Sequence, residues 1–343
     1  MIVRKDNCRQ LAEAKNTVAK QFTSAIGGPK AAAVLCMVLL LAISLSCLPA
    51  AETSAEPFSL RTVTYTEGNQ SVTVRADAEY IDMGDVVIKD YARFEQFVKG
   101  FSNLKKLDMF STRIKKAQIE HLAATFPDIE FGWTIVIPCT NKLHPERTPH
   151  VIRTDATAFS TLHNNTCTSH SNEDLAVLRF CKNLQALDVG HNSLTDLSFL
   201  YSLPHLKVLI VACNINLRDI TPIGSLKELQ YLEIFKNDIH DISCLVNCPD
   251  LVDLNICFNR ISDLTPIYQL KKLRRLWIYN SNNWSKEQPV PKAAVTALRE
   301  ALPDCYIDSV NWSTDGGWRV HPRYDTIYEM FWGTEYIPFT TLD

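Results

Sequence analysis

Glycine is scarce in this 343-residue chain, and the motifs that glycine usually builds are missing. Only 11 glycines are present, and none forms a glycine-rich phosphate loop. The sequence also has no paired C-x-x-C motif, no nucleophile elbow and no carboxylate pair of recognisable spacing. These absences argue against phosphate-dependent and nucleophilic catalysis. We therefore expect no enzymatic activity and no cofactor.

Strong positive charge is missing from most of the chain as well. The net charge is −3, but residues 1–50 carry +4, which leaves −7 on the remainder. Nucleic-acid binding depends on Lys and Arg side chains that neutralise phosphates, so we expect no nucleic-acid partner. The hydrophobic content of 46% is sufficient for a large buried core.

The basic start precedes an uncharged apolar run at residues 31–48, AAAVLCMVLLLAISLSCL. Such a run is typical of a cleaved export signal, a retained membrane anchor or, through Cys47, a lipid-attachment site. All three alternatives predict that the rest of the chain is extracytoplasmic, either secreted or anchored. They also predict that only residues 31–48 contact a membrane. The eight cysteines after this run lack the dense spacing of a disulfide-rich mini-protein, so we expect mostly free thiols.

An internal repeat of about 22 residues dominates the second half of the chain. It is seen in LQALDVGHNSLTDLSFL, LKVLIVACNINLRDITPI, LQYLEIFKNDIHDISCL, LVDLNICFNRISDLTPI and LRRLWIYNSNN. The first leucines of these segments are 22, 23, 22 and 22 residues apart. The shared pattern, L-x-x-L-x-[VI]-x-x-N-x-[IL], resembles the leucine-rich repeat family in its 22-residue, internalin-like form.

Each position of the repeat has a physical role. The leucines and the Val or Ile point inward, where stacked coils bury them together. The asparagines form a structural ladder that satisfies backbone groups of adjacent coils: Asn192, Asn214, Asn237 and Asn259. A helix or 3₁₀ turn then begins at a capping residue, which we expect to be Ser198, Thr221, Ser243 and Thr265.

These patterns predict an α/β solenoid. It consists of a curved leucine-rich repeat array with a parallel concave sheet, short helical or 3₁₀ convex turns, and degenerate helical repeats on both sides. Two similar helix-Pro-Asp-strand units, 119–131 and 295–307, bracket the array as caps. The expected order is an export signal or anchor (1–50), a linker and β-hairpin (51–78), a degenerate N-terminal cap (79–137), a polar insertion loop (138–174), the array (175–283) and a C-terminal cap (284–343).

Residues between the inward positions of each strand point to the concave face and form rows across the coils. The later coils place large aromatic residues and a few charged ones in these rows, a composition typical of protein-binding patches. The expected partner-binding residues are Tyr231, Glu233, Phe235, Asp253, Asn255, Cys257, Phe258, Arg275, Trp277 and Tyr279. The alternative is that the insertion or the C-terminal tail covers this face. We expect the tail, with a helix over DTIYEMFW, to seal the last coil instead.

The polar segment 139–170 is rich in cysteine and histidine. Three of its residues, His163, Cys167 and His170, are candidate ligands for a transition metal. Their spacing matches no established metal signature, so an ordered loop is the simpler interpretation. A metal-binding extracytoplasmic protein remains the alternative function.

The family resemblance implies a function that the pattern alone does not give. Leucine-rich repeat proteins of this kind bind protein ligands on the concave sheet, often at a bacterial cell surface. The sequence therefore predicts a non-enzymatic exported protein, acting as a monomer, that binds a protein or another cell-surface macromolecule.

Overall fold

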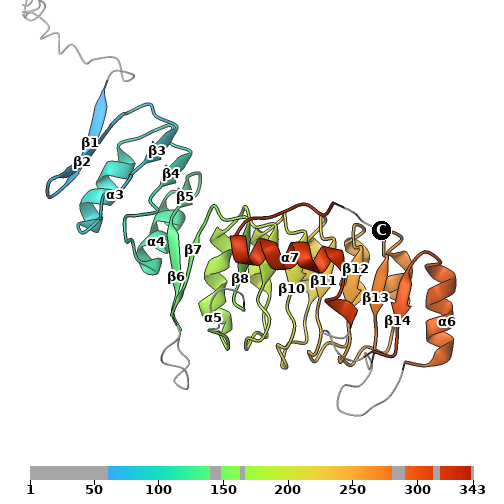
Figure 1. The fold of residues 1–343 in the computed structure, drawn as a ribbon. Coiled ribbons are helices and arrows are strands. Elements are labelled where there is room, and N and C mark those ends of the chain that lie inside the picture. Colours follow the sequence, from blue (N-terminus) through green and yellow to red (C-terminus); the bar gives the residue numbers. More distant parts are fainter. Residues whose placement is uncertain (1–60, 140–147, 163–166, 280–289, 312–316, 341–343) are drawn as a thin grey trace, which may run out of the picture. The chain divides into compact units, whose positions relative to one another are not determined.

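The structure is a computed structural model that describes residues 61–139, 148–162, 167–279, 290–311 and 317–340 (Figure 1). All of them lie within one compact unit, Ser59–Asp343. The apolar run 31–48 and the candidate ligand His163 lie outside the described residues. In the part of the chain that is described, no helix is long and apolar enough to cross a membrane.

The first described elements form the predicted hairpin. Strands β1 (Thr62–Glu67) and β2 (Gln70–Arg75) pair in antiparallel fashion, with Glu67 opposite Gln70. Gly68 has a φ of +59° at the first loop position, a conformation that a residue without a Cβ adopts readily. The alternating sequence on both sides of this turn therefore folds as expected.

A small parallel sheet follows the hairpin. Its strands are β3 (Tyr80–Asp82), β4 (Lys106–Asp108) and β5 (Glu130–Gly132). The connections contain α3 (Tyr91–Lys99), which Asp90 caps by accepting a bond from the Arg93 N–H, and α4 (Lys116–Thr125). These are the degenerate helical repeats that the sequence predicts before the array.

Two described segments of the predicted polar insertion, residues 138–174, are strands. Strand β7 (His150–Arg153) pairs with β6 (Thr134–Ile137) in antiparallel fashion. Strand β8 (Ala158–Ser160) joins the main sheet, where Phe159 lies opposite Leu187. The prediction of a simple loop is wrong here because Phe159 takes the place of an inward leucine and adds one coil to the array.

The main sheet is parallel and has seven strands. They are arranged in chain order from β8 to β14. The remaining six strands are β9 (Ala186–Asp188), β10 (Val208–Ile210), β11 (Tyr231–Glu233), β12 (Asp253–Asn255), β13 (Arg275–Trp277) and β14 (Tyr306–Asp308).

Short helical turns return the chain on the other side of each coil. They are α5 (Asn172–Leu175) and the 3₁₀ segments η2 (Ala176–Phe180), η3 (Ser198–Ser202), η4 (Thr221–Ser225), η5 (Ser243–Asn247) and η6 (Thr265–Gln269). Leu203, Leu226, Cys248 and Leu270 are fully buried at the ends of these turns. Cys248 is thus a core residue, as its repeat position predicts.

The 3₁₀ turns begin at the predicted residues, but these residues are not the caps. Ser198, Thr221, Ser243 and Thr265 are the first residues of the turns, whereas the N-cap positions are one residue earlier. Those positions hold apolar residues that make no side-chain capping bond: Leu197, Ile220, Ile242 and Leu264. Instead, the aspartate two positions before each first residue accepts its backbone N–H; for example, Asp219 Oδ1 lies 2.8 Å from Thr221 N. An aspartate bonded to the backbone two residues ahead is a common turn former, so the Asp of the repeat is the structural cap.

The C-terminal end of the array and its sheet are covered by different helices. Helix α6 (Lys292–Ala301) and strand β14 close the C-terminal end, as the helix-Pro-Asp-strand motif predicts. Helix α7 (Pro322–Gly333) does not seal the last coil. It lies across the sheet from β12 to β8 (Figure 1), where it contacts β8 and β9. The prediction for the tail is therefore wrong in its location.

Candidate functional site

The strand register aligns the residues that the sequence predicts to form rows on the concave face. Tyr231 lies opposite Val208 on one side and Asp253 on the other. In the next row, Glu233 lies opposite Ile210 and Asn255. These pairings follow from the constant repeat length, which returns the same template position to the same place on each strand.

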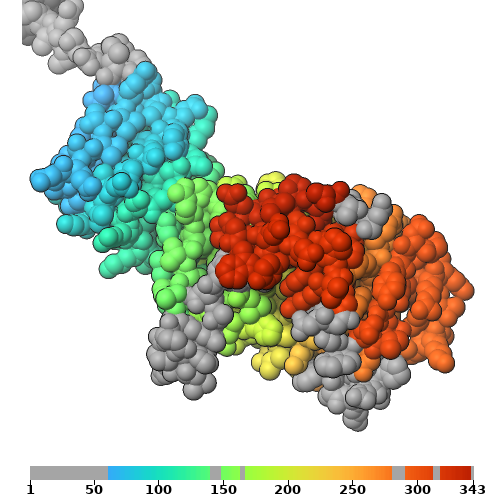
Figure 2. All heavy atoms as spheres, viewed as in Figure 1, coloured from blue at the N-terminus to red at the C-terminus, as the bar shows by residue number. Residues whose placement is uncertain are grey.

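The predicted surface is not open, however. Seven of its ten residues are buried: Tyr231, Glu233, Asp253, Asn255, Cys257, Arg275 and Trp277. The largest exposed fraction among them is 7%, for Arg275. Figure 2 shows the C-terminal residues, in red, lying over the green and yellow strands. The prediction that these seven side chains contact a partner is wrong, because they are buried. Residues 317–333, called the C-terminal strap below, contact five of them: Tyr231, Glu233, Asp253, Arg275 and Trp277.

Glu233 is the first anchor for the strap. Its Oε2 accepts a bond from the indole Nε1 of Trp318 at 3.0 Å, and its Oε1 accepts one from Arg319 at 3.2 Å. Tyr231 donates its hydroxyl to the same carboxylate at 3.2 Å. The Trp318 ring also packs against Tyr231 and Trp277, with ring centroids 5.3 and 5.9 Å apart. Polar and aromatic contacts thus hold Trp318, which is fully buried, on the sheet.

Asp253 is the second anchor. Arg323 donates to both of its carboxylate oxygens, from Nε at 2.6 Å and from Nη2 at 2.8 Å. Arg275 adds a longer bond of 3.3 Å to Asp253 and donates to the Trp318 carbonyl at 2.7 Å. Because Arg323 is only 1% exposed, this is a buried bidentate ion pair, and each charge depends on the other for compensation.

Apolar contacts complete the attachment of the strap. Ile327, Met330 and Phe331 are buried at helical spacing on one side of α7. They cluster with small and aliphatic residues of the early coils: Ala158, Ala186, Val208, Ile210 and Ala212. Small side chains on these strands leave room for a helix. The apolar spacing in DTIYEMFW indicates a helix with one buried side, but it does not indicate which surface of the solenoid that side covers.

Three predicted residues remain partly accessible beside the strap: Phe235, Phe258 and Tyr279, called the aromatic ladder below. Their rings contact in order, with centroids 5.4 Å apart at both steps. Phe258 has a φ of +57°, and Lys236 has the same left-handed conformation one coil earlier. Non-glycine residues rarely adopt it, and here a bond from the Phe258 N–H to the Tyr279 carbonyl supports it. The aromatic ladder is therefore a fixed edge of the sheet.

The asparagines make the bonds expected of a structural ladder. In Asn214, Oδ1 accepts from Leu194 N at 3.0 Å, and Nδ2 donates to the carbonyls of Val189 and Val211 at 3.1 and 3.2 Å. Asn259 likewise bonds to Ile239 N and to carbonyls of two successive coils. These buried amides join each coil to the one before it.

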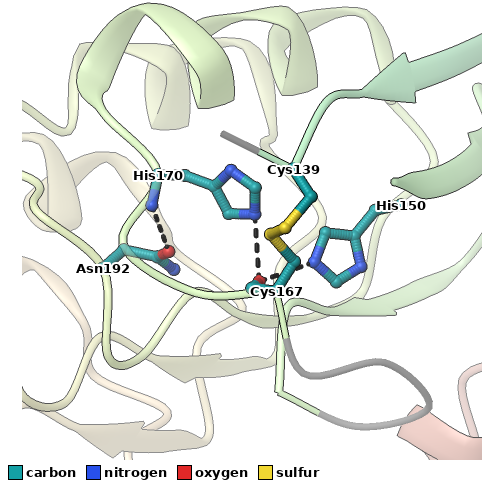
Figure 3. The surroundings of a disulfide bond; sticks show 5 residues. All are labelled: Cys139, His150, Cys167, His170 and Asn192. Carbon is teal, nitrogen blue, oxygen red and sulfur yellow. Dashed lines mark hydrogen bonds between the residues drawn. A yellow bond between two sulfur atoms is a disulfide. The ribbon is translucent and has the colours of Figure 1, made fainter. Parts of the chain in front are cut away.

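A disulfide lies where the sequence suggested metal ligands (Figure 3). Cys139 and Cys167 are bonded to each other, so the Cys167 sulfur is not a thiolate ligand. His150 and His170 both place Nε2 on the Cys167 carbonyl, at 2.8 and 3.0 Å. Within the described ranges, no group of three His, Cys, Asp or Glu side chains is placed to hold a metal ion. The disulfide therefore removes Cys167 from the three candidate ligands.

The two histidines are buried and neutral. A carbonyl oxygen only accepts, so each Nε2 carries a proton and donates it. Burial lowers the pKa of both imidazoles, and the nearby His150 lowers the pKa of His170 further. The rings lie 5.2 Å apart, and the backbone N–H of His170 donates to Asn192 of the asparagine ladder. This cluster fixes the chain where β8 enters the array.

A family model identifies the repeat. The model for leucine-rich repeats, in two copies, matches residues 182–225 and 227–269. These coils are leucine-rich repeats. No curated protein matches the chain.

Several solved structures are similar to the chain at low identity. Internalin C2 of Listeria monocytogenes is 22% identical, with a TM-score of 0.33 over 58% of this chain and 80% of its own. An internalin F of the same organism is 17% identical, with a TM-score of 0.38 over 66% and 72%. A leucine-rich repeat protein of Leptospira interrogans is 16% identical, with a TM-score of 0.34 over 75% and 59%.

The thiols of the leucine-rich repeats are in environments that suppress reactivity. Cys257, predicted to be a surface residue, is 1% exposed, and burial raises the pKa of its thiol. Burial also raises the pKa of Cys213. Six described cysteines are free, as predicted for most of them, whereas Cys139 and Cys167 are paired. A protonated, buried thiol is a poor nucleophile, so these residues pack rather than react.

Proposed function

We propose that this leucine-rich repeat protein is a non-enzymatic, exported binding protein whose partner is another protein. The partner docks on the aromatic ladder, Phe235, Phe258 and Tyr279, beside the C-terminal strap. The observation that carries the proposal is this row of three half-buried aromatic side chains on a rigid edge of the sheet. Aromatic residues are enriched in protein interfaces because they bury a large area and lose little side-chain entropy.

The flanks of the aromatic ladder suit a protein partner. Lys236 is exposed beside Phe235 and Phe258 and supplies a charge at the rim of the patch. Interfaces usually combine an apolar centre with a polar rim, where the charges steer and orient the partner. The buried residues Tyr231 and Trp277 take no direct part in this docking. They hold the strap, and the strap sets one border of the accessible surface.

Export is supported by the disulfide as well as by the N-terminal sequence. Cys139 and Cys167 meet with an S–S distance of 1.97 Å across a sequence separation of 28 residues. Disulfides of this kind persist in oxidising compartments and are rare in the reducing cytosol. The pairing is thus in agreement with an exported chain, which residues 31–48 suggest independently.

The experiment compares capture of partners by three forms of the full-length protein. The wild type, the double variant Phe235→Ser/Tyr279→Ser and the control variant Tyr328→Ser are each coupled to a resin and exposed to cell-surface extracts. Tyr328 is 47% exposed and lies on α7, outside the aromatic ladder. We expect a specific protein to be retained by the wild type and by Tyr328→Ser, and to be lost from the double variant. Equal retention by all three forms would refute the assignment of the ladder.

A further inference from the structure

Strands β13 and β14 lie beyond the part of the sheet that α7 crosses. Between these strands and residues 317–321 there is a cavity of about 830 Å³. This volume is in the range of pockets that bind small molecules. The residues whose side chains matter for its chemistry are Arg274, Trp277, Asp304, Tyr306, Asn311 and His321.

Tyr306 provides an aromatic surface in this cavity. Its side chain is 61% exposed, and its hydroxyl donates to Asp308 Oδ2 at 3.3 Å, which restrains the ring. Trp277 lies on the neighbouring strand, opposite Asp308 in the register. Restrained aromatic rings are suitable for packing against the C–H groups of a flat ligand.

Hydrogen-bond donors and acceptors occur together around these rings. Asn311 donates its Nδ2 to Asp308, which leaves its Oδ1 as an acceptor. Asp304 is exposed, and among the described residues it has no ion-pair or hydrogen-bond partner. His321 Nδ1 accepts from Arg323 N at 3.2 Å, so Nε2 carries the proton and is a donor. Arg274 is half-buried and makes one long bond, to the Leu273 carbonyl at 3.5 Å, so most of its N–H donors are available.

The charges around the cavity cancel. Two arginines, Arg274 and Arg275, face two aspartates, Asp304 and Asp308. Arg275 also pairs with Asp253. The Asp308 carboxylate accepts four hydrogen bonds, which come from Tyr306, Val310 and Asn311. Burial, followed by the nearby Arg275 and Arg323, lowers the pKa of His321, which keeps this imidazole neutral. The described residues that line the cavity therefore carry no net formal charge with which to select an anion or a cation.

We propose that this cavity binds a neutral saccharide. A sugar presents C–H groups on its ring face and hydroxyls that both donate and accept at its rim. Those groups match an exposed aromatic ring surrounded by Arg274 and His321 as donors and by Asp304 and Asn311 as acceptors. The site is separate from the aromatic ladder and does not depend on the proposed protein partner.

Calorimetric titration of the full-length protein tests the proposal. The probes are four neutral trisaccharides, namely maltotriose, cellotriose, laminaritriose and N,N′,N″-triacetylchitotriose, with sialyllactose as an anionic comparison. We expect at least one neutral probe to bind more tightly than sialyllactose. Failure of all four to bind overturns the proposal, and so does binding of sialyllactose as tight as that of every neutral probe.

Variants locate the binding in the cavity. Tyr306→Ala removes the ring and is expected to weaken binding by about tenfold, which corresponds to about 1.4 kcal/mol. Tyr306→Phe keeps the ring and is expected to retain most of the affinity, and it also tests the site if Tyr306→Ala folds poorly. Arg274→Gln is expected to weaken binding, whereas the control Tyr328→Ala is not. Unchanged binding in both Tyr306→Ala and Arg274→Gln would place the sugar elsewhere and contradict the proposal.

Discussion

The three-stranded and seven-stranded parallel sheets have the same strand pairing, but their outward side chains differ in exposure. In the three-stranded sheet, Tyr80, Lys106 and Glu130 are aligned in register, and in the seven-stranded sheet Tyr231 is aligned with Asp253. Tyr80 keeps 53% of its surface exposed, whereas Tyr231 is fully buried. The backbone pattern alone does not decide whether such a face is open.

Side-chain composition explains the difference. On the three-stranded sheet, Lys106 pairs with Glu130 at 3.4 Å, and the Tyr80 hydroxyl donates to Asp108 at 3.0 Å. These charged and polar groups remain partly hydrated and neutralise one another, so the face is stable in water. The seven-stranded sheet presents aliphatic and aromatic residues around the carboxylates of Glu233 and Asp253, and such a face gains free energy when it is covered. The strap supplies the apolar surface that covers this face. It also supplies Arg319 and Arg323, which pair with the two carboxylates.

The strongest test of this comparison is to remove a charge from the covered sheet. We expect Arg323→Met to lower the free energy of unfolding by about 3 kcal/mol, because Asp253 then stays buried with only the longer bond to Arg275. Urea unfolding measures this change. Lys106→Met in the open sheet removes two partly exposed pairs, with Glu130 and with Asp108, and should change the free energy by less than about 1 kcal/mol. Similar losses in both variants would contradict the contrast between the two sheets.

The periodic part of the fold could be predicted from the sequence because a constant repeat length determines the register. The inward leucines, the asparagine ladder and the alignment of Tyr231 with Asp253 all follow from spacing. The coil that contains β8 was missed because Phe159 replaces its inward leucine. The 3₁₀ caps were assigned to Thr221 rather than to Asp219, since both residue types favour that role and only the bond geometry distinguishes them.

The repeat spacing could not predict that the C-terminal strap covers the seven-stranded sheet. Trp318 and Glu233 are 85 residues apart, and no local pattern reports that their side chains meet. The tail showed an amphipathic helix, but an amphipathic helix can pack on the end of a solenoid as well as on its sheet. The disulfide is a similar case, since sequence spacing does not determine which cysteines pair.

A smaller effect is expected when Asn214 of the asparagine ladder, or the residue at the same repeat position near the three-stranded sheet, is replaced. In Asn214→Ala, the Leu194 N–H loses its side-chain acceptor inside the core, so the free energy of unfolding should fall by about 1–3 kcal/mol. Thr112 has the corresponding place near the three-stranded sheet and donates once, to the Met109 carbonyl at 2.8 Å. Thr112→Val should therefore lower it by only about 0.5–1.5 kcal/mol. Denaturant unfolding measures both losses of free energy, and a larger loss in Thr112→Val than in Asn214→Ala would contradict this comparison.

The smallest expected effect concerns acid stability at the first coil of the covered sheet. Burial lowers the pKa of His150 and His170 in the folded state, so below the unfolded value of 6.5 the unfolded chain binds more protons. The stability from these neutral imidazoles is complete above pH 6.5 and declines as the pH falls. Between pH 6.5 and 5.5 the loss is at most about 1.4 kcal/mol for each histidine.

Urea unfolding at pH 7.5 and at pH 5.5 measures this decline. The double variant His150→Gln/His170→Gln should lose less stability between the two pH values than the wild type, because glutamine keeps an N–H donor and does not titrate. His121→Gln is the matched control beside the open sheet, since His121 is exposed on α4 and lies 3.4 Å from Glu95. An equal pH dependence in the wild type and the double variant would show that the buried pair does not link folding to acid. That result would leave the burial of His150 and His170 as a matter of packing alone.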